Sequence, residues 1–258
     1  MKLEKIISWL DRTLKVADFD DVSNNGLQLD RFPALSTGHQ ALSTAHEVRV
    51  VAFAVDASVR AVEVAAKAGA QLLVVHHGIS WGGGIKRLEG GVGNVVRAAM
   101  KANLAIAAYH LPLDAHPTLG NNAQLAKYFG LKKVRPAFSY HGNVIGLVGV
   151  LESLEALEVL GLLEKSAPLK APLTLGICSG GAGEFAEEAK NLGCDLYLTG
   201  EASWGDMIAA ENCGMRMVCA GHYETEVFGV RALSKAMKKA LKVRTVDLTG
   251  ELSPKAKA

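Results

Sequence analysis

The stretch that decides the fold runs from residue 72 to residue 81 and reads LLVVHHGISW. An apolar run, Leu72 to Val75, ends on the adjacent histidines His76 and His77, which predicts a buried strand that carries two imidazoles at its end. Neighbouring side chains on a strand point to opposite faces, so two adjacent ligands would serve two metal ions more naturally than one. The alternative is one packed, hydrogen-bonded histidine beside one that faces water.

The segments around this strand alternate between strand and helix patterns. Before it we expect a strand at residues 50–55 and a helix at 58–68, and after it a glycine-rich loop at 82–93, a helix at 94–102 and a strand at 104–108. The same order returns later, with strands expected at 174–179 and 196–198 around a helix at 184–191. Residues 199–204, TGEASW, then take the place of HHGISW at 76–81.

The repeat continues when the glycine-rich loop is treated as an insertion, because residues 94–114 then align without gaps to residues 206–226. In this register His110 falls on His222 and Asp114 falls on Glu226, so each half ends a strand with His-x-x-x-carboxylate. Internal repetition predicts an α/β protein made of two related units with a site at their junction. We expect the first unit at residues 1–133 plus 215–258 and the second at 134–214.

Composition limits the class of protein. The chain of 258 residues is 49% hydrophobic and 21% charged with a formal net charge of +2, as in soluble globular proteins. It shows no signal-peptide pattern, no apolar run that approaches a membrane span and no dense basic block in its body, so we expect a cytoplasmic protein without a membrane or nucleic-acid partner. The four cysteines form no Cys-x-x-Cys pair, so imidazoles and carboxylates would hold any metal.

The candidate site residues suit transition metals. Imidazole with carboxylate fits zinc, iron, manganese, cobalt or nickel, and a carboxylate can bridge two ions about 3.5–4 Å apart. Each His-x-x-x-acid motif taken alone is more typical of a surface ion pair or a helix cap than of a metal site. Glu201, Glu224 and Asp206 are expected either to support the site or to face solvent. Trp81 and Trp204 are expected in the core, with stacking on a flat substrate as the alternative. The candidates are His76, His77, His110, Asp114, His222 and Glu226.

Several motifs together resemble one family, the Nif-three-like proteins, also labelled GTP cyclohydrolase type-two homologues. The motifs are SNNGLQ at 23–28, HHG at 76–78 with Trp81, HLPLD at 110–114 with GNN at 120–122, TGE at 199–201 and GHYETE at 221–226. The resemblance implies two intertwined α/β units with mixed sheets, and two divalent metal ions per chain in a toroidal homohexamer. It places the metals on His76, His77, Asp114, His222 and Glu226, with the glutamate bridging. It gives His110 a role in proton transfer or in support of the ligands, rather than as a ligand.

The family label implies a small-molecule substrate and a hydrolase that opens the imidazole ring of a purine nucleotide such as GTP by metal-activated water, releasing formate. The alternative is a metal-binding scaffold or metal-delivery ring without turnover. A nucleic-acid-processing ring is a third interpretation, which depends on the basic segment 235–242, KAMKKALK; a solvated amphipathic helix explains that segment more simply.

Overall fold

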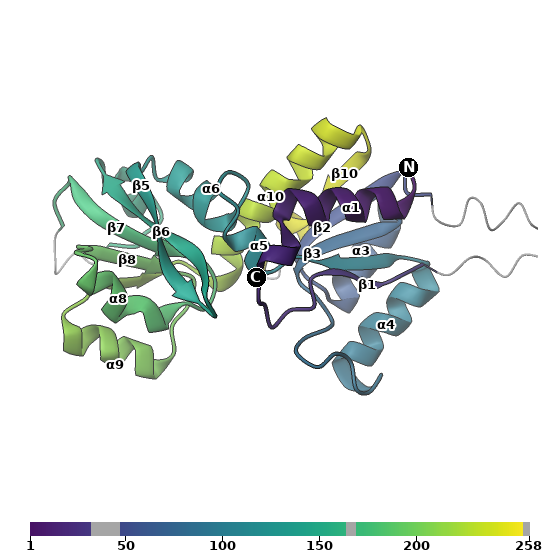
Figure 1. Cartoon of the computed structure of the whole chain (residues 1–258), viewed down its shortest axis with the longest axis horizontal. Coiled ribbons are helices and arrows are strands. Elements are labelled where there is room, and N and C mark those ends of the chain that lie inside the picture. The colour runs from purple at the N-terminus through teal and green to yellow at the C-terminus, as the bar shows by residue number, and fades with distance from the viewer. Residues whose placement is uncertain (32–46, 164–168, 255–258) are drawn as a thin grey trace, which may run out of the picture. The chain divides into compact units, whose positions relative to one another are not determined.

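The computed structural model describes residues 1–31, 47–163 and 169–254. The chain divides into two compact units, the first made of residues 1–113 and 230–258 and the second of residues 114–229. The described residues form two five-stranded sheets, one in each unit (Figure 1). Helix α10 (His222–Leu241) begins in the second unit and continues into the first.

The sheet of the first unit has the strand order β1-β4-β3-β2-β10. Its members are β1 (Gly26–Leu29), β2 (Val50–Asp56), β3 (Leu72–His77), β4 (Ala105–Ala108) and β10 (Arg244–Asp247). The last four pair in parallel, whereas β1 pairs antiparallel with β4. The other elements are α1 (Leu3–Leu14), the 3-10 turn η1 (Val16–Asp18), α3 (Val59–Lys67), α4 (Gly90–Ala102), α5 (Leu111–Asp114) and α11 (Thr249–Leu252).

An apolar core holds α3 and α4 against one face of this sheet. Val62 of α3 and Val95 of α4 pack with Ala54 of β2 and Leu73 of β3, all buried. Ser58 caps α3 by accepting a hydrogen bond from the backbone N–H of Ala61. As is typical of a central strand in a parallel sheet, β3 is apolar from Leu72 to Val75, and its burial continues to His76.

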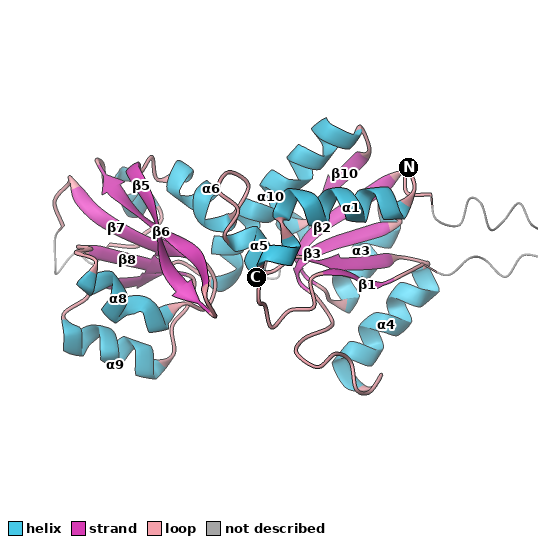
Figure 2. Cartoon of the chain, viewed as in Figure 1, coloured by secondary structure: helices cyan, strands magenta, loops and turns pink. Residues whose placement is uncertain are grey.

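The sheet of the second unit has the order β5-β6-β7-β8-β9 and is likewise mixed: β5-β6-β7 are antiparallel and β7-β8-β9 are parallel. Figure 2 shows α8 and α9 side by side. The strands are β5 (Lys132–Tyr140), β6 (Asn143–Leu151), β7 (Leu173–Cys178), β8 (Leu196–Thr199) and β9 (Met217–Cys219). The other elements are α6 (Asn121–Tyr128), α7 (Glu155–Val159), the 3-10 turn η2 (Gly183–Phe185), α8 (Ala186–Asn191) and α9 (Trp204–Cys213).

The two faces of β8 bury different partners, as strand geometry requires. Leu196 and Leu198 join an apolar cluster with Leu125 of α6. The intervening Tyr197 lies against Phe138, with ring centroids 5.2 Å apart. The second sheet is therefore covered on both faces.

The expected fold class is confirmed, and the duplication is visible in the topology. The order β2-α3-β3-α4-β4 in the first unit matches β7-α8-β8-α9-β9 in the second, and in each the three strands are parallel neighbours. The observed units differ in their boundaries from the expected 1–133 plus 215–258 and 134–214. The reason is packing: α6 lies on β6 and β7, so it belongs to the second unit.

Helix α4 begins at Gly90, so the expected start at residue 94 is wrong. Glycine has low helix propensity, which hides the first turn in the sequence. Packing overrides propensity here, because a Cβ on Gly93 would lie only 2.5 Å from the backbone oxygen of Leu88. Among the described residues, no helix combines the length and apolar character needed to cross a bilayer.

Candidate metal-binding site

Three histidines converge in the first unit at the ends of β3 and β4. The ring of His76 lies 4.6 Å from that of His77 and 5.1 Å from that of His110, measured between centroids. One nitrogen from each of the three side chains lies within 4.8 Å of the other two. His76 is fully buried, whereas the His77 and His110 side chains are partly exposed. Solvent therefore reaches the cluster on the side of His77 and His110.

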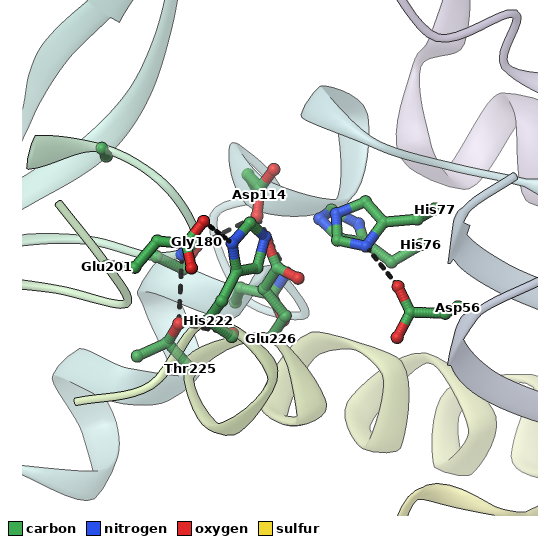
Figure 3. A network of polar contacts seen from close by, with 12 residues as sticks. Asp56, His76, His77, Asp114, Gly180, Glu201, His222, Thr225 and Glu226 are labelled. Atoms are coloured by element: carbon green, nitrogen blue, oxygen red, sulfur yellow. Dashed lines mark hydrogen bonds and ion pairs between the residues drawn. The ribbon is translucent and has the colours of Figure 1, made fainter. Parts of the chain in front are cut away.

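Hydrogen bonds fix the tautomers of the two adjacent histidines. Nδ1 of His76 lies 2.9 Å from the backbone oxygen of Tyr109, and Nδ1 of His77 lies 2.8 Å from Oδ1 of Asp56 (Figure 3). A carbonyl oxygen and a carboxylate only accept, so each Nδ1 must donate. In the neutral imidazole the lone pair then belongs to Nε2, the arrangement found in metal-ligating histidines whose other nitrogen is held by a carboxylate or carbonyl.

His110 is held by the polar turn that precedes β1. Its Nδ1 lies 2.9 Å from Oδ1 of Asp21, and its backbone N–H donates to Oδ1 of Asn25 at 2.7 Å. Asp21 also accepts from the backbone N–H of Leu111 and from the Asn25 amide. Burial opposes ionisation of Asp21, but the hydrogen bonds and charge of its neighbours, His110 first, lower the pKa of its carboxyl below the usual value of 3.8. A carboxylate therefore orients His110 through Nδ1, as it does His77.

A second set of candidate ligands lies in the second unit, at the start of α10. His222 is the first residue of this helix and Glu226 follows one turn later, with 3.2 Å between Nε2 of the histidine and Oε1 of the glutamate. Nδ1 of His222 lies 2.9 Å from Oε1 of Glu201 (Figure 3). If Nδ1 donates to Glu201, Nε2 of a neutral ring carries a lone pair that faces the Glu226 carboxylate, and the two repel. A second proton on the ring or a bound metal ion would remove this repulsion.

Asp114 is buried in the same unit and oriented by two donors. The Asn121 amide and the Ser179 hydroxyl both donate to its Oδ1, at 2.8 and 3.0 Å. Asn121 also accepts from the backbone N–H of Gly229 at 2.7 Å, which ties the carboxylate to α10. Its neighbour Asn122 donates to the backbone oxygen of Ile145 and accepts from the N–H of Ser179. Asn121 and Asn122 thus hold together the segments that surround the Asp114 carboxylate.

Two glycines allow the backbone to pass close to these ligands. Gly180 has φ +71°, and a Cβ there would collide with Oε1 of Glu226. A Cβ on Gly200 would lie 2.6 Å from Oγ1 of Thr225 and 2.8 Å from Cα of His222. The Gly in TGE at 199–201 is therefore required by close approach rather than by a turn, since its φ is not among the positive values.

Two residues that orient the histidines, Asp56 and Asp21, were not predicted as site residues from the sequence. Asp56 ends β2 and pairs in register with His77 on the neighbouring strand, so an acid at the end of the preceding parallel strand was a readable signal. Asp21 lies far from His110 in sequence, and only tertiary contact reveals it. Glu201, expected either to support the site or to face solvent, lies against His222. Asp206 closes a capping box with Ser203, at the start of α9.

The two tryptophans are exposed, so the expectation that they lie in the core is wrong. Trp81 is 36% exposed and Trp204 is 76% exposed. Trp81 stands at the histidine cluster, with its ring 5.2 Å from that of His110 and 6.1 Å from that of His77. Trp81 is therefore a candidate functional residue because it lies beside the histidines, and not because it is buried.

The residues present fit divalent transition metals. Each of the four histidines has its Nδ1 against an acceptor, and two buried carboxylates, Asp114 and Glu226, supply negative charge. Nitrogen and oxygen donors without a thiolate suit zinc, iron, manganese, cobalt or nickel. These histidine and glutamate groups could hold metal.

The chain is an α/β protein of two mixed sheets whose clustered histidines and carboxylates could bind metal. The chain belongs to the Duf34/NIF3 (NGG1p interacting factor 3) family, whose model matches residues 1–254. A relative from Pyrococcus horikoshii called "GTP cyclohydrolase 1 type 2 homolog" is 35% identical, covering 95% of this chain and 97% of its own. A relative from Deinococcus radiodurans with the same name is also 35% identical, covering 90% and 86%. The solved structure of protein ybgI, described as of unknown function, is 27% identical, with a TM-score of 0.81 and coverage of 96% and 97%.

Proposed function

We propose that this protein is a metal-dependent hydrolase with a dinuclear centre. In this proposal the residues that would hold the metal ions are His76, His77, Asp114, His222 and Glu226. The observation that carries the proposal is the common hydrogen-bonding of the imidazoles, which presents Nε2 of His76 and His77 to a ligand. The metal ions themselves would supply Lewis acidity and a water of lowered pKa.

The protein's own residues would position the reactants and move protons. Asp56 and Glu201 hold the rings of His77 and His222 through Nδ1. His110, oriented by Asp21, carries its lone pair on Nε2 and can accept a proton from the attacking water and return it to the leaving nitrogen. The buried Asp21 carboxylate stabilises the imidazolium that forms in between.

We propose a purine nucleotide as substrate, opened at its imidazole ring. Support comes from the names of the relatives, "GTP cyclohydrolase 1 type 2 homolog". One water opens the ring and a second releases its C8 carbon as formate, so each turnover consumes two waters and needs no redox partner.

Metal content and formate release test the proposal together. Glu226→Gln keeps the size of the side chain but removes its charge, so we expect loss of at least one metal ion per chain and of formate release from GTP. His77→Ala should give the same double loss if both sets serve one centre. Glu187→Gln on the exposed side of α8 is the matched control and should change neither. Full formate release from folded Glu226→Gln would refute the role proposed for the metal centre, and absence of formate release from the metal-loaded wild type would refute the hydrolase.

The alternative is a metal-binding or metal-delivery protein without turnover. It is favoured by the exposure of the second set, since the Glu201 side chain is 64% exposed and that of His222 is 35% exposed. It predicts metal that exchanges readily with chelators and the absence of formate from any purine nucleotide. Metal analysis and the formate assay on the same preparation separate the two functions.

We also propose a homohexameric ring in the cytoplasm. Apolar side chains on one side of α9, Trp204, Met207 and Ile208, are 76%, 50% and 38% exposed, as expected for a surface that another subunit covers. The four cysteines are free thiols, consistent with a reducing compartment. Sedimentation equilibrium of the wild-type chain tests the hexamer, and a monomer at micromolar concentration would refute it.

A further inference from the structure

A cavity of about 450 Å³ lies in the first unit beside the histidine cluster. It opens at the carboxyl ends of β2 and β3, where α3 and α4 begin. Its size is that of a small-molecule site. The lining residues are Ala57, Val59, Gly78, Ile79, Trp81, Gly91, Val92, Asn94 and Val95.

Trp81 is mounted rigidly in the wall of this cavity. Its indole N–H donates to the backbone oxygen of Gly78 at 3.1 Å, so the polar edge of the ring is already used. Its backbone pairs with Ser23, and the preceding Ile79 and Ser80 both donate their N–H groups to the Gln28 side chain. What Trp81 offers a ligand is therefore a fixed, partly exposed aromatic surface, which favours stacking at little entropic cost.

The rest of the lining is apolar with one polar side chain. Val59, Ile79 and Val92 supply aliphatic surface, and none of the described lining residues carries a charged side chain. Asn94 Oδ1 accepts from Arg97, which leaves the amide N–H groups of Asn94 to donate to a ligand atom. Such a wall suits a flat, uncharged ring with acceptor atoms at its edge.

The cavity adjoins the proposed reaction centre through Trp81. The Trp81 ring lies 5.2 Å from that of His110, almost perpendicular at 77°, and 6.1 Å from that of His77. Trp81 is thus shared by the wall of the cavity and the histidine cluster. Gln28 and Gly78 fix this geometry, because a Cβ on Gly78 would collide with the Gln28 side chain.

We propose that this cavity binds the heteroaromatic base of the substrate by stacking on Trp81, with Asn94 donating to an acceptor at the edge of the base. The inference rests on the proposed function, whose substrate it specifies as a nucleobase-containing compound recognised by its ring. The sugar and phosphates would lie outside the cavity.

Fluorescence of Trp81 tests this directly in the full-length chain. Trp9→Phe combined with Trp204→Phe leaves Trp81 as the single tryptophan. Titration with guanosine, adenosine and GTP should quench its emission saturably with at least one of them, and ribose 5-phosphate should not. No saturable quenching by any of the three, or equal quenching by ribose 5-phosphate, would overturn the proposal.

Variants separate stacking from a general effect on folding. Trp81→Ala should weaken binding of the quenching nucleoside about ten- to a hundredfold in equilibrium dialysis, the usual range for loss of one base–aromatic stack, and Trp81→Phe should restore most of it. Val92→Asp should weaken binding similarly by placing a charge in the cavity. Val159→Asp, on an exposed turn of α7 in the second unit, is the control and should bind as the wild type does. Unchanged affinity in Trp81→Ala would overturn the proposal.

The same proteins distinguish failure of this inference from failure of the hydrolase. Trp81-dependent nucleoside binding without formate release would support the cavity and refute the proposed reaction. Formate release that survives in Trp81→Ala with unchanged KM would overturn the cavity as the base site and leave the hydrolase standing.

Discussion

Asn121→Ala should both destabilise the fold and empty the metal site. The Asn121 side chain is fully buried and makes two hydrogen bonds, one to Oδ1 of Asp114 and one from the N–H of Gly229. Removing a charge-assisted partner costs about 1.5–3 kcal/mol, and leaving a buried N–H unsatisfied costs about 1–3 kcal/mol. Allowing for relaxation, we expect the free energy of unfolding to fall by about 3 kcal/mol.

Asn122→Ala is the matched control. It removes an equally buried amide that also makes two hydrogen bonds, to the Ile145 oxygen and from the Ser179 N–H, so its cost in stability should be about the same, 2–4 kcal/mol. Of the two asparagines, Asn121 donates directly to the Asp114 carboxylate, whereas Asn122 is linked to it only through Ser179. We therefore expect metal content to fall much further in Asn121→Ala than in Asn122→Ala.

The assay is guanidinium unfolding followed by circular dichroism, with metal analysis of the folded protein. A loss of less than about 1 kcal/mol in Asn121→Ala would refute the reasoning about buried partners. Equal metal loss in both asparagine variants would show that the metal responds to stability and not to the orientation of Asp114.

Two further predictions concern a backbone position and a carboxylate. Gly180→Ala should lower the free energy of unfolding by about 1–2 kcal/mol through its positive φ, and it should also displace Glu226 and lower metal content. Gly193→Ala is the control, because Gly193 has φ +76° and open space around it, so only the backbone cost should apply. Equal metal content in the two variants would contradict the close-approach argument. For Asp21→Asn we expect a pH-dependent loss of stability, because the folded pKa of Asp21 lies below 3.8: its contribution is complete above that value and disappears as the pH falls through the lower folded pKa. The free energies of unfolding in urea of wild type and Asp21→Asn should thus differ most near neutral pH and converge below about pH 4. A pH-independent difference would refute the role of the ionised form. The exposed acid variant Glu63→Gln is the control.

Patterns along the chain were enough for the architecture. Continuous apolar runs predicted buried parallel strands, and the matched His-x-x-x-acid motifs predicted the duplication that the topology displays in β2-β3-β4 and β7-β8-β9. They failed where packing outweighs propensity, as at the glycine-rich start of α4, and where burial cannot be read from residue type, as for Trp81 and Trp204.

Residue type and spacing were enough to propose metal ligands, because the histidines and acids stand in local motifs at the ends of strands. How those side chains are held depends on packing between distant segments. Asp21 is brought to His110 from the turn before β1, Asp56 is brought to His77 by strand register, and Asn121 ties Asp114 to α10. These partners lie far apart in sequence, and hydrogen bonds between distant residues form only when packing has fixed both ends.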